Sequence, residues 1–372
     1  MWVGYMKQKK ILIIGHTNTM GGVETFIKNT TLYSDKKKTR FYFLIHGYDT
    51  CLFREEINKF YGKNSFYFVP RFKDNPIKTV FALFRFYKKH HNFDFIHVQT
   101  GAAAEILYCF PYCLLYGIKV IVHSHNGGNL HSFFDHQAFK GLVNYISNIK
   151  LACSREAAFY MFGKKMGIKA KIVPVGIDIN NFKFSQHKRD IFRKKYGISE
   201  EKIVIGVAGR FTKQKNQGFA IKVFKEYHNI NPDSFLILKG RGEMEDELRE
   251  QIARSGIGQD ILIINDLEDM SVLYSALDIF FMPSLFEGLP QVAVEAQASG
   301  LPCLFSNNIS KEADITGSCI MLSLNDDIGK WIKSIELLVQ RKTDHSKGYM
   351  LVKNKGYDIY DTVKVLEDIY GV

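Results

Sequence analysis

Short runs of β-branched and aromatic residues alternate with helical segments along the whole chain, and this alternation constrains the fold more than any other feature. It is typical of βαβ units, in which a helix links each strand to a parallel neighbour. The pattern occurs twice, so the sequence predicts an α/β fold with two sheets. The expected strands are Lys10–Gly15, Phe41–His46, Phe93–Gln99, Val120–His125, Lys150–Ser154 and Lys171–Val175, then Lys202–Gly209, Ser234–Lys239, Asp260–Asn265, Asp278–Pro283 and Leu301–Ser306.

A polar, charge-rich stretch, residues 183–201, separates the two series and predicts a linker. A chain of 372 residues also exceeds the usual size of one domain. We therefore expect two Rossmann-like domains, residues 1–183 and 202–355, that face each other across a cleft, because such sheets bind ligands at the carboxyl ends of their strands. Residues 356–372 carry apolar side chains at helical spacing and predict a C-terminal helix that packs back across both domains.

Positive charge is concentrated in the first half of the chain. Residues 1–200 carry 31 Lys and Arg but 13 Asp and Glu, a net charge of +18, whereas the remaining residues carry −6. Basic clusters with Phe and Tyr nearby, such as Lys88 and Lys89, suit an anionic membrane surface or a diphosphate-bearing lipid. The same charge would attract nucleic acid, and a solvated basic face is an equally good explanation.

No segment predicts a membrane-spanning helix, which needs about 18 consecutive apolar residues. The first ten residues lack the features of a signal peptide. The six cysteines show no paired metal-ligand spacing, which is typical of free thiols in a reducing cytosol. These features predict a cytoplasmic protein that lies peripherally on the inner face of the cell membrane.

Two cations follow the first strand of the second series. Arg210 and Lys215 lie in the segment directly after a strand expected to be buried. A guanidinium and an ammonium together can neutralise the charge that builds up on a departing diphosphate. For this segment alone, a pair of loop cations exposed to water is the alternative.

Two carboxylates accompany a predicted helix later in the second series. Glu287 lies in the loop before the helix and Glu295 on the helix, where their oxygens can accept hydrogen bonds from sugar and ribose hydroxyls. Pro290 suits a first helical turn. Backbone N–H groups from Gly288 and Leu289 onward then suit the phosphates of a donor. A capping glutamate and an unrelated surface glutamate are the alternative.

Together these segments resemble the second domain of family 4 glycosyltransferases, retaining enzymes with the two-Rossmann "B" fold (GT-B), and the two glutamates match the family's Glu-seven-residues-Glu signature. The resemblance implies that Arg210 and Lys215 contact the nucleotide diphosphate. It implies that Glu295 contacts the ribose and that Glu287 lies near the donor-sugar hydroxyls and the anomeric centre. It also implies an acceptor-binding first domain. Further donor-site residues are Gly209, Gly240, Gly288 and Leu289.

Weaker matches to the family lie in the first domain. Gly21 and Gly22 follow the first strand, where the family has a glycine pair that lets the backbone approach the donor phosphate or the acceptor. His125 aligns with the family's active-site histidine near the donor sugar. Ordinary buried or strand-end histidines are the alternative. The expected acceptor contacts are Glu24, His123 and Asn126.

Two positions depart from the family pattern. Val175 stands where the usual residue is Asn, which weakens any hydrogen-bonding role there. Arg241 stands where the family usually has an acidic residue, so its direct role is open. Its neighbour Gly240 still allows the chain to pass close to the nucleotide.

A metal centre is the main rival chemistry, because His123, His125, His131 and His136 cluster in sequence. No Asp or Glu with clear ligand spacing accompanies them. There is also no Asp-x-Asp for a divalent ion beside the diphosphate, in agreement with Arg210 and Lys215 doing that work. We expect no metal and no cofactor.

The sequence thus predicts a retaining glycosyltransferase that moves a sugar from a nucleotide donor, a UDP-sugar, to a lipid-linked oligosaccharide in capsule or exopolysaccharide biosynthesis. The expected partners are this donor, the acceptor and the anionic inner leaflet, with no nucleic acid. The alternatives are a nucleotide-sugar epimerase or a phosphorylase of the same architecture, and a non-catalytic nucleotide-sugar-binding or membrane-associated protein.

Overall fold

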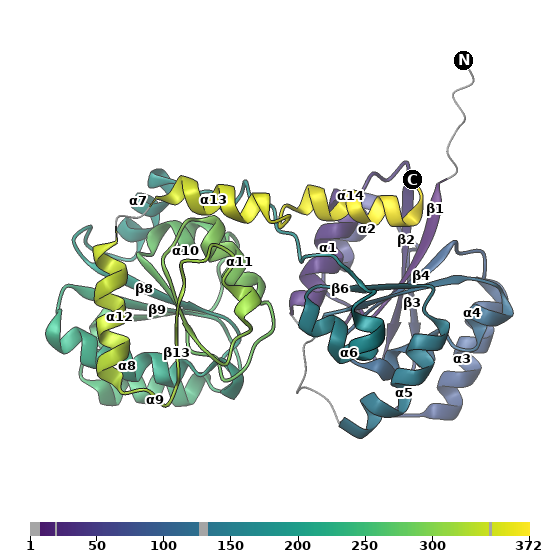
Figure 1. The fold of residues 1–372 in the computed structure, drawn as a ribbon, viewed down its shortest axis with the longest axis horizontal. Coiled ribbons are helices and arrows are strands. Elements are labelled where there is room, and N and C mark those ends of the chain that lie inside the picture. The colour runs from purple at the N-terminus through teal and green to yellow at the C-terminus, as the bar shows by residue number, and fades with distance from the viewer. Residues whose placement is uncertain (1–7, 19–20, 126–132, 342–343) are drawn as a thin grey trace, which may run out of the picture. The chain divides into compact units, whose positions relative to one another are not determined.

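The computed structural model describes residues 8–18, 21–125, 133–341 and 344–372 (Figure 1). The chain forms two compact units. Unit 1 comprises Met1–Gly176 and Ile359–Val372, and unit 2 comprises Ile177–Asp358. Each unit contains one parallel sheet, so the predicted α/β class with two Rossmann-like sheets is confirmed.

Unit 1 is built on a parallel sheet whose central strands are apolar and buried. Ile11, Leu12 and Ile14 of the innermost strand have no exposed surface. Such near-continuous apolar strands are typical of a parallel sheet that is covered on both faces. The strand order is β3 (Phe66–Val69), β2 (Thr39–His46), β1 (Lys9–Ile14), β4 (Phe95–Thr100), β5 (Lys119–Ser124), β6 (Ile149–Ala152) and β7 (Lys171–Ile172).

Helices cover this sheet, and the last helix of the chain is one of them. They are α1 (Gly22–Tyr33), α2 (Arg54–Tyr61), α3 (Pro76–Lys89), η1 (Ala103–Tyr108), α4 (Tyr112–Leu115), α5 (Phe133–Ile146), α6 (Arg155–Gly167) and α14 (Ile359–Tyr370). The Asn75 side chain caps α3, which begins at Pro76, and such local signals define where a helix starts. Helix α14 packs on α1, where the rings of Tyr33 and Tyr360 meet at 5.2 Å.

Unit 2 repeats the arrangement with a second parallel sheet. Its strand order is β10 (Ile261–Ile264), β9 (Ser234–Lys239), β8 (Ile203–Ala208), β11 (Ile279–Met282), β12 (Cys303–Ser306) and β13 (Ile320–Leu322). Its helices are α7 (Gln186–Lys195), η2 (Lys213–Lys215), α8 (Gln217–Ile230), α9 (Glu245–Ser255), η3 (Gly258–Asp260), α10 (Met270–Ala276), α11 (Gln291–Ala298), η4 (Lys311–Ala313), α12 (Ile328–Gln340) and α13 (His345–Asn354). The central order β9-β8-β11 brings together the strand ends that matter below.

The segment predicted as a linker, residues 183–201, instead contains α7, which packs against α10 within unit 2. Two of its arginines are not solvated as those of a linker would be. The Arg193 guanidinium is buried and lies 2.7 Å from the Asp278 carboxylate, and Arg189 pairs with the same carboxylate at 2.7 Å. A buried ion pair with its remaining N–H groups on backbone carbonyls anchors α7 to the core.

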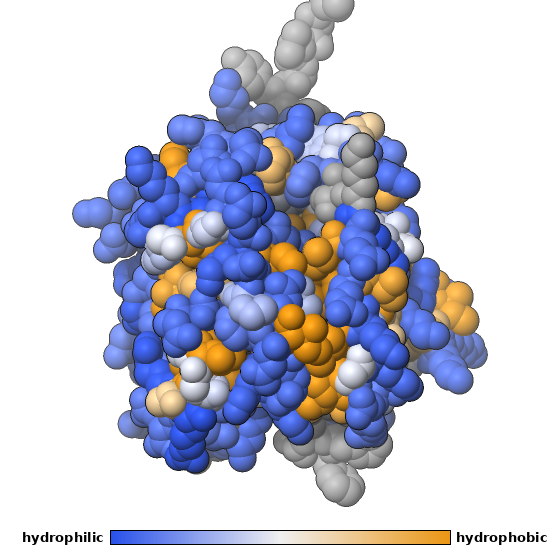
Figure 2. Space-filling view, turned by 90° about the vertical axis from the view of Figure 1, so that its left-hand side faces the viewer, coloured by the Kyte–Doolittle hydropathy of each residue, from blue (hydrophilic) through white to orange (hydrophobic). Residues whose placement is uncertain are grey.

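The described residues contain no helix long and apolar enough to cross a membrane. On the face shown in Figure 2 the surface is mostly hydrophilic, and hydrophobic residues show between the polar ones. Scattered apolar residues on a surface need no special explanation.

Candidate active site

The candidate donor residues lie at one edge of the unit 2 sheet. Residues 209–216 follow β8, residues 240–243 follow β9 and residues 283–290 follow β11. These three strands are neighbours and run parallel, so their carboxyl ends lie together. Segments that are up to 80 residues apart in sequence therefore converge at this edge, where Rossmann-type sheets bind their ligands.

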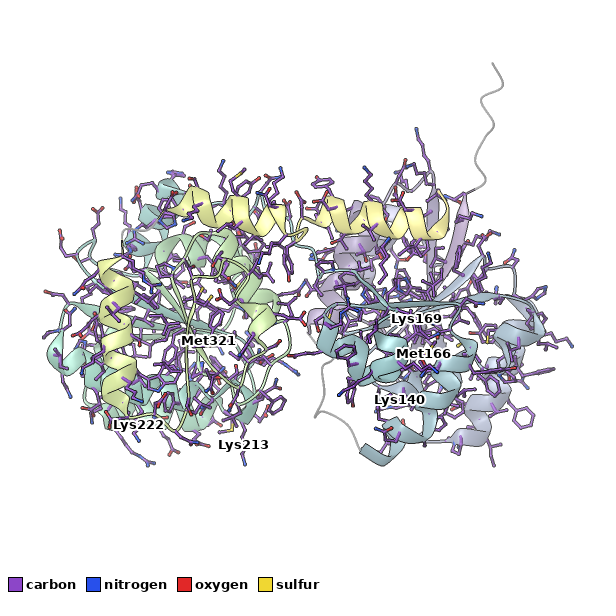
Figure 3. The ribbon with its side chains drawn as sticks, viewed as in Figure 1. Lys140, Met166, Lys169, Lys213, Lys222 and Met321 are labelled. Carbon is purple, nitrogen blue, oxygen red and sulfur yellow. The ribbon has the colours of Figure 1, made fainter. Side chains whose placement is uncertain are left out.

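An ion pair joins the first and third of these loops. The Lys215 Nζ lies 2.6 Å from Oε1 of Glu287, and both side chains are largely shielded from solvent. Lys213, two residues away, is exposed instead (Figure 3). A charge-assisted contact of this length holds the ammonium in one place, so Lys215 is positioned before any ligand arrives.

The loop that carries Glu287 is held on both sides by hydrogen bonds. The Gln214 amide donates to the backbone oxygen of Phe286 at 3.0 Å and to Oε1 of Glu287 at 3.2 Å. On the other side, the Ser310 N–H donates to the backbone oxygen of Glu287 at 3.0 Å. The sequence analysis did not identify Gln214, because a lone glutamine in a loop carries no recognisable signal.

Arg210 extends from the loop after β8 and is exposed. Its guanidinium forms no ion pair with a carboxylate of the described residues, whereas Lys215 does. Its backbone is fixed, because the buried Gln217 side chain donates to the Arg210 carbonyl at 2.9 Å. Arg210 therefore has an anchored backbone and a guanidinium that is free to bind an anion.

Two glycines allow the β8 and β9 loops to touch. A Cβ at Gly240 would lie 2.0 Å from the Gly209 carbonyl oxygen, which no side chain tolerates. Gly209 itself has φ +147°, a conformation that favours glycine, and a Cβ there would press on the Lys215 side chain at 3.2 Å. Gly240 therefore lets the β9 loop approach the β8 loop, and Gly209 leaves room for the Lys215 side chain within the β8 loop.

Glu295 lies on α11, and its carboxyl group is shielded from solvent. Tyr274, which is fully buried, donates its hydroxyl to Oε2 of Glu295 at 2.8 Å. Burial raises the pKa of Glu295 to about 7, and the Tyr274 hydrogen bond and the nearby Lys239 charge oppose this rise. Burial in turn lowers the pKa of Lys239, the last residue of β9. Neither Tyr274 nor Lys239 was identified from the sequence, since each looks like an ordinary core or strand-end residue.

The N-terminus of α11 lies between the two glutamates. Pro290 precedes the helix, and the backbone N–H groups of Gly288 and Leu289 donate to no group of the described residues. The first N–H groups of any helix also lack intrahelical partners. This segment therefore offers backbone donors to an anion, next to Glu287.

A separate pocket of about 220 Å³ opens at the carboxyl ends of strands β1, β2 and β4 in unit 1. Its polar groups are two carboxylates, an imidazole and an amide. Glu105 lies 2.9 Å from Nε2 of His46, and Thr17 donates to Glu24 at 2.6 Å. The lining residues are Gly15, Thr17, Val23, Glu24, His46, Gln99, Thr100, Gly101, Ala102 and Glu105.

The predicted glycine pair lies at the start of α1 beside this pocket. Gly21 is the N-cap of α1 and Gly22 its first residue. A Cβ at Gly21 would lie 2.7 Å from Oε2 of Glu24. Glycine at this position therefore lets the Glu24 carboxylate fold back over the helix start and line the pocket.

His125 ends a chain of hydrogen bonds that runs into the core of unit 1. Its Nε2 lies 2.6 Å from Oε1 of Gln99, whose amide nitrogen lies 3.2 Å from Nε2 of His97, and His97 Nδ1 contacts the Tyr370 hydroxyl at 2.7 Å. An amide oxygen only accepts, so His125 carries its proton on Nε2 and leaves Nδ1 as an acceptor. Burial lowers the pKa of both His97 and His125 to about 3, so both rings are neutral.

His123 is fully buried and packs between His125, His97 and Phe26, with ring centroids 4.3 to 5.6 Å away. Among the described residues its ring nitrogens form no hydrogen bond of normal geometry, and the polar group that influences them is the Val173 backbone. A ring without exposed surface cannot touch an acceptor, so the predicted acceptor contact at His123 is not available here. The ring supports His125 by packing. The other predicted contact in this segment, Asn126, lies outside the described residues.

Within the part of the chain that the structure describes, no group of three His, Cys, Asp or Glu side chains is placed to hold a metal ion. His136, one of the four clustered histidines, contacts the Tyr160 carbonyl at 3.0 Å instead. His131 lies outside the described residues. Arg241, at the family's usual acidic position, pairs with Asp266 at the surface.

Two family models match the chain, one over each half. The model described as Glycosyltransferase Family 4 matches residues 20–181, and the model described as Glycosyl transferases group 1 matches residues 188–339. The second match contains the whole donor edge of unit 2, from Arg210 to Glu295.

Individual relatives agree with these models. The chain is 29% identical to the putative glycosyltransferase EpsF of Bacillus subtilis (strain 168), over 98% of this chain and 97% of that one. It is 25% identical to the Escherichia coli UDP-Gal:alpha-D-GlcNAc-diphosphoundecaprenol alpha-1,3-galactosyltransferase, over 79% of each.

Solved structures share the fold. The crystal structure of Anabaena Alr3699/HepE in complex with UDP superposes with a TM-score of 0.81 at 16% identity, over 98% of this chain and 100% of that one. At this identity the likeness concerns the fold, which is the GT-B fold. Given matches to both halves of the chain and a donor edge built from the family's residues, the protein belongs to family 4 of the glycosyltransferases and uses a nucleotide-sugar donor.

Proposed function

We propose that the protein transfers a sugar from a UDP-sugar to a hydroxyl of a lipid-linked oligosaccharide, with retention of the anomeric configuration, in capsule or exopolysaccharide assembly. The observation that carries this proposal is the Lys215–Glu287 pair at 2.6 Å, with Arg210 on the same loop as Lys215 and its guanidinium in no ion pair with a carboxylate of the described residues. Together they offer two cations to a diphosphate and a carboxylate to a sugar. Two similar proteins support these substrates. The Escherichia coli enzyme is named for UDP-galactose and a diphosphoundecaprenol acceptor, and the structure of Anabaena Alr3699/HepE has also been solved with UDP-glucose.

In this proposal the residues of unit 2 bind the donor. Arg210 and Lys215 contact the diphosphate, with the backbone donors at Gly288 and Leu289 beside them. Glu287 accepts hydrogen bonds from the donor sugar while it holds Lys215 in place. Glu295 accepts a hydrogen bond from the ribose.

The reaction needs no nucleophilic side chain. The acceptor oxygen forms the new bond to the anomeric carbon on the face from which UDP departs, and the departing phosphate oxygen takes the acceptor's proton. Arg210 and Lys215 stabilise the negative charge that develops on that phosphate. His125, with Nδ1 as an acceptor, lies near the donor sugar in this proposal, and Glu24 and its pocket bind the acceptor.

A panel of UDP-sugars tests the proposal. A matched donor should raise the melting temperature and be hydrolysed slowly in the absence of acceptor, with release of free sugar and UDP in equal amounts. An epimerase would return an altered UDP-sugar without free UDP, and a non-catalytic binding protein would give the thermal shift without hydrolysis.

A further inference from the structure

Helix α3 presents an apolar face to the outside of unit 1. Its buried side chains are Thr79, Leu83, Phe86 and Tyr87. On the opposite side Ile77 is 70% exposed and Phe81 is 62% exposed, and Val80 and Phe84 lie beside them. A surface helix normally turns polar residues outward, so this face is unusual.

Helix α4 extends this apolar face. The Tyr87 and Tyr112 rings stack at 4.8 Å, and the Tyr112 hydroxyl donates to the Val80 carbonyl, so α4 lies against α3 (Figure 1). Leu114 and Leu115 of α4 are 53% and 68% exposed. We name the set Ile77, Val80, Phe81, Phe84, Leu114 and Leu115 the α3–α4 surface.

Basic residues border this surface, and α3 contains no acidic residue. At 100° per residue, Lys88 falls within the apolar stripe and Arg85 falls beside Phe81. Lys78 and Lys89 continue the basic border, and all four cations are exposed. None of them pairs with a carboxylate in the part of the chain that the structure describes. An apolar stripe flanked on one side by unpaired cations complements a bilayer whose headgroups are anionic.

We propose that the α3–α4 surface docks the protein on an anionic lipid bilayer, with Phe81 and its apolar neighbours entering the boundary between headgroups and acyl chains. Lys78, Arg85, Lys88 and Lys89 then contact lipid phosphates. The inference rests on the proposed function, because a lipid-linked acceptor is presented at such a surface. It specifies a surface that inserts apolar side chains, which net charge alone does not predict.

Vesicle co-sedimentation of the full chain tests this inference. The probes are vesicles of phosphatidylglycerol mixed with phosphatidylcholine, and vesicles of phosphatidylcholine alone. The triple variant Ile77→Ser, Phe81→Ser, Phe84→Ser should bind the anionic vesicles at least about tenfold more weakly than the wild type. All three side chains are exposed, so folding should be unaffected.

A matched control removes equally exposed apolar side chains from unit 2, with Ile191→Ser, Ile230→Ser and Leu337→Ser. It should bind like the wild type. Both triple variants should hydrolyse UDP-sugar at the wild-type rate, because none of these residues lies at the donor edge. If none of these proteins hydrolyses a UDP-sugar, the wild type included, the proposed function is wrong. The vesicle-binding result still tests the membrane-docking inference in that case.

Equal vesicle binding by the wild type and the α3–α4 serine variant would overturn the inference. The inference would also be overturned if the wild type were a dimer, the serine variant a monomer, and the two bound vesicles equally. The α3–α4 surface would then be an interface between two copies of the chain. As a second readout, Phe81→Trp should shift its emission to the blue when anionic vesicles are added, and an unchanged spectrum would count against insertion.

Discussion

The two units place different groups at the carboxyl ends of their sheets. Unit 2 gathers cations: Lys215 in its pair with Glu287, the Arg210 guanidinium and the strand-end Lys239. Unit 1 has no such set of cations among its described residues: it combines neutral rings, with His97 and His125 held uncharged by burial, and the carboxylates of Glu24 and Glu105. The comparison suggests a division of labour, in which unit 2 binds a doubly charged leaving group and unit 1 positions neutral hydroxyls.

The largest expected effect follows from removing a charge at the unit 2 edge. Lys215→Ala should lower kcat for UDP-sugar hydrolysis by a factor of about 100 to 1,000, because the departing diphosphate loses a positioned cation. The control Lys213→Ala removes an exposed lysine two residues away and should be near wild type. Near-normal turnover in Lys215→Ala would contradict the assignment.

The next effect concerns the carboxyl group of Glu295. Its folded pKa of about 7 lies above the ordinary value of 4.5, so the folded state resists its ionisation. Stability from this group is complete below pH 4.5 and is lost as the pH rises to about 7. Relative to Glu295→Gln, the wild type should therefore lose on the order of 2–3 kcal/mol over this range. Chemical denaturation across the range measures it, and parallel curves for the two proteins would refute it.

Backbone contact between the β8 and β9 loops gives a smaller effect. Gly240→Ala places a Cβ against the Gly209 carbonyl, so unit 2 should lose roughly 2 kcal/mol of unfolding free energy and bind UDP more weakly. Gly141→Ala is the control, because a Cβ there meets no atom within 4 Å. Equal melting temperatures and UDP affinities in the two variants would show that the close approach is unimportant.

The smallest effect tests the neutral rings of unit 1. Burial holds the pKa of His123 well below 6.5, so its contribution to stability is present above pH 6.5 and is lost as the pH falls. His123→Phe should therefore be more stable than the wild type at pH 6 by about 1 kcal/mol, relative to their difference at pH 8. The exposed His187→Phe should show no such change. A pH-independent difference for His123→Phe would contradict a buried neutral imidazole.

The sequence predicted the sheet architecture well because central parallel strands form apolar runs. The two strands that it missed, β3 and β13, are edge strands of four and three residues, and runs this short do not show a clear repeating pattern. The linker was wrong for a different reason. Its arginines look solvated in sequence, but Arg193 is buried against Asp278, a partner 85 residues away that local patterns cannot reveal.

For the candidate site, motif spacing predicted which chemical groups are present but not which ion pairs and hydrogen bonds they form. The pattern of Glu287 and Glu295 predicts two similar carboxylates, whereas the structure pairs one with Lys215 and places the other beside Tyr274. Likewise, His123 and His125 alternate along one predicted strand, yet His125 forms a 2.6 Å hydrogen bond with the Gln99 side chain whereas His123 packs between rings. Such differences depend on contacts between distant elements.

The central claim is that Arg210, Lys215, Glu287 and Glu295 bind one nucleotide sugar. A crystal structure of the protein with UDP tests it most directly. We expect diphosphate oxygens within hydrogen-bond distance of Lys215 Nζ and the Arg210 guanidinium, with the ribose hydroxyls on Glu295. A UDP molecule bound elsewhere, with these side chains unchanged and solvated, would contradict the account.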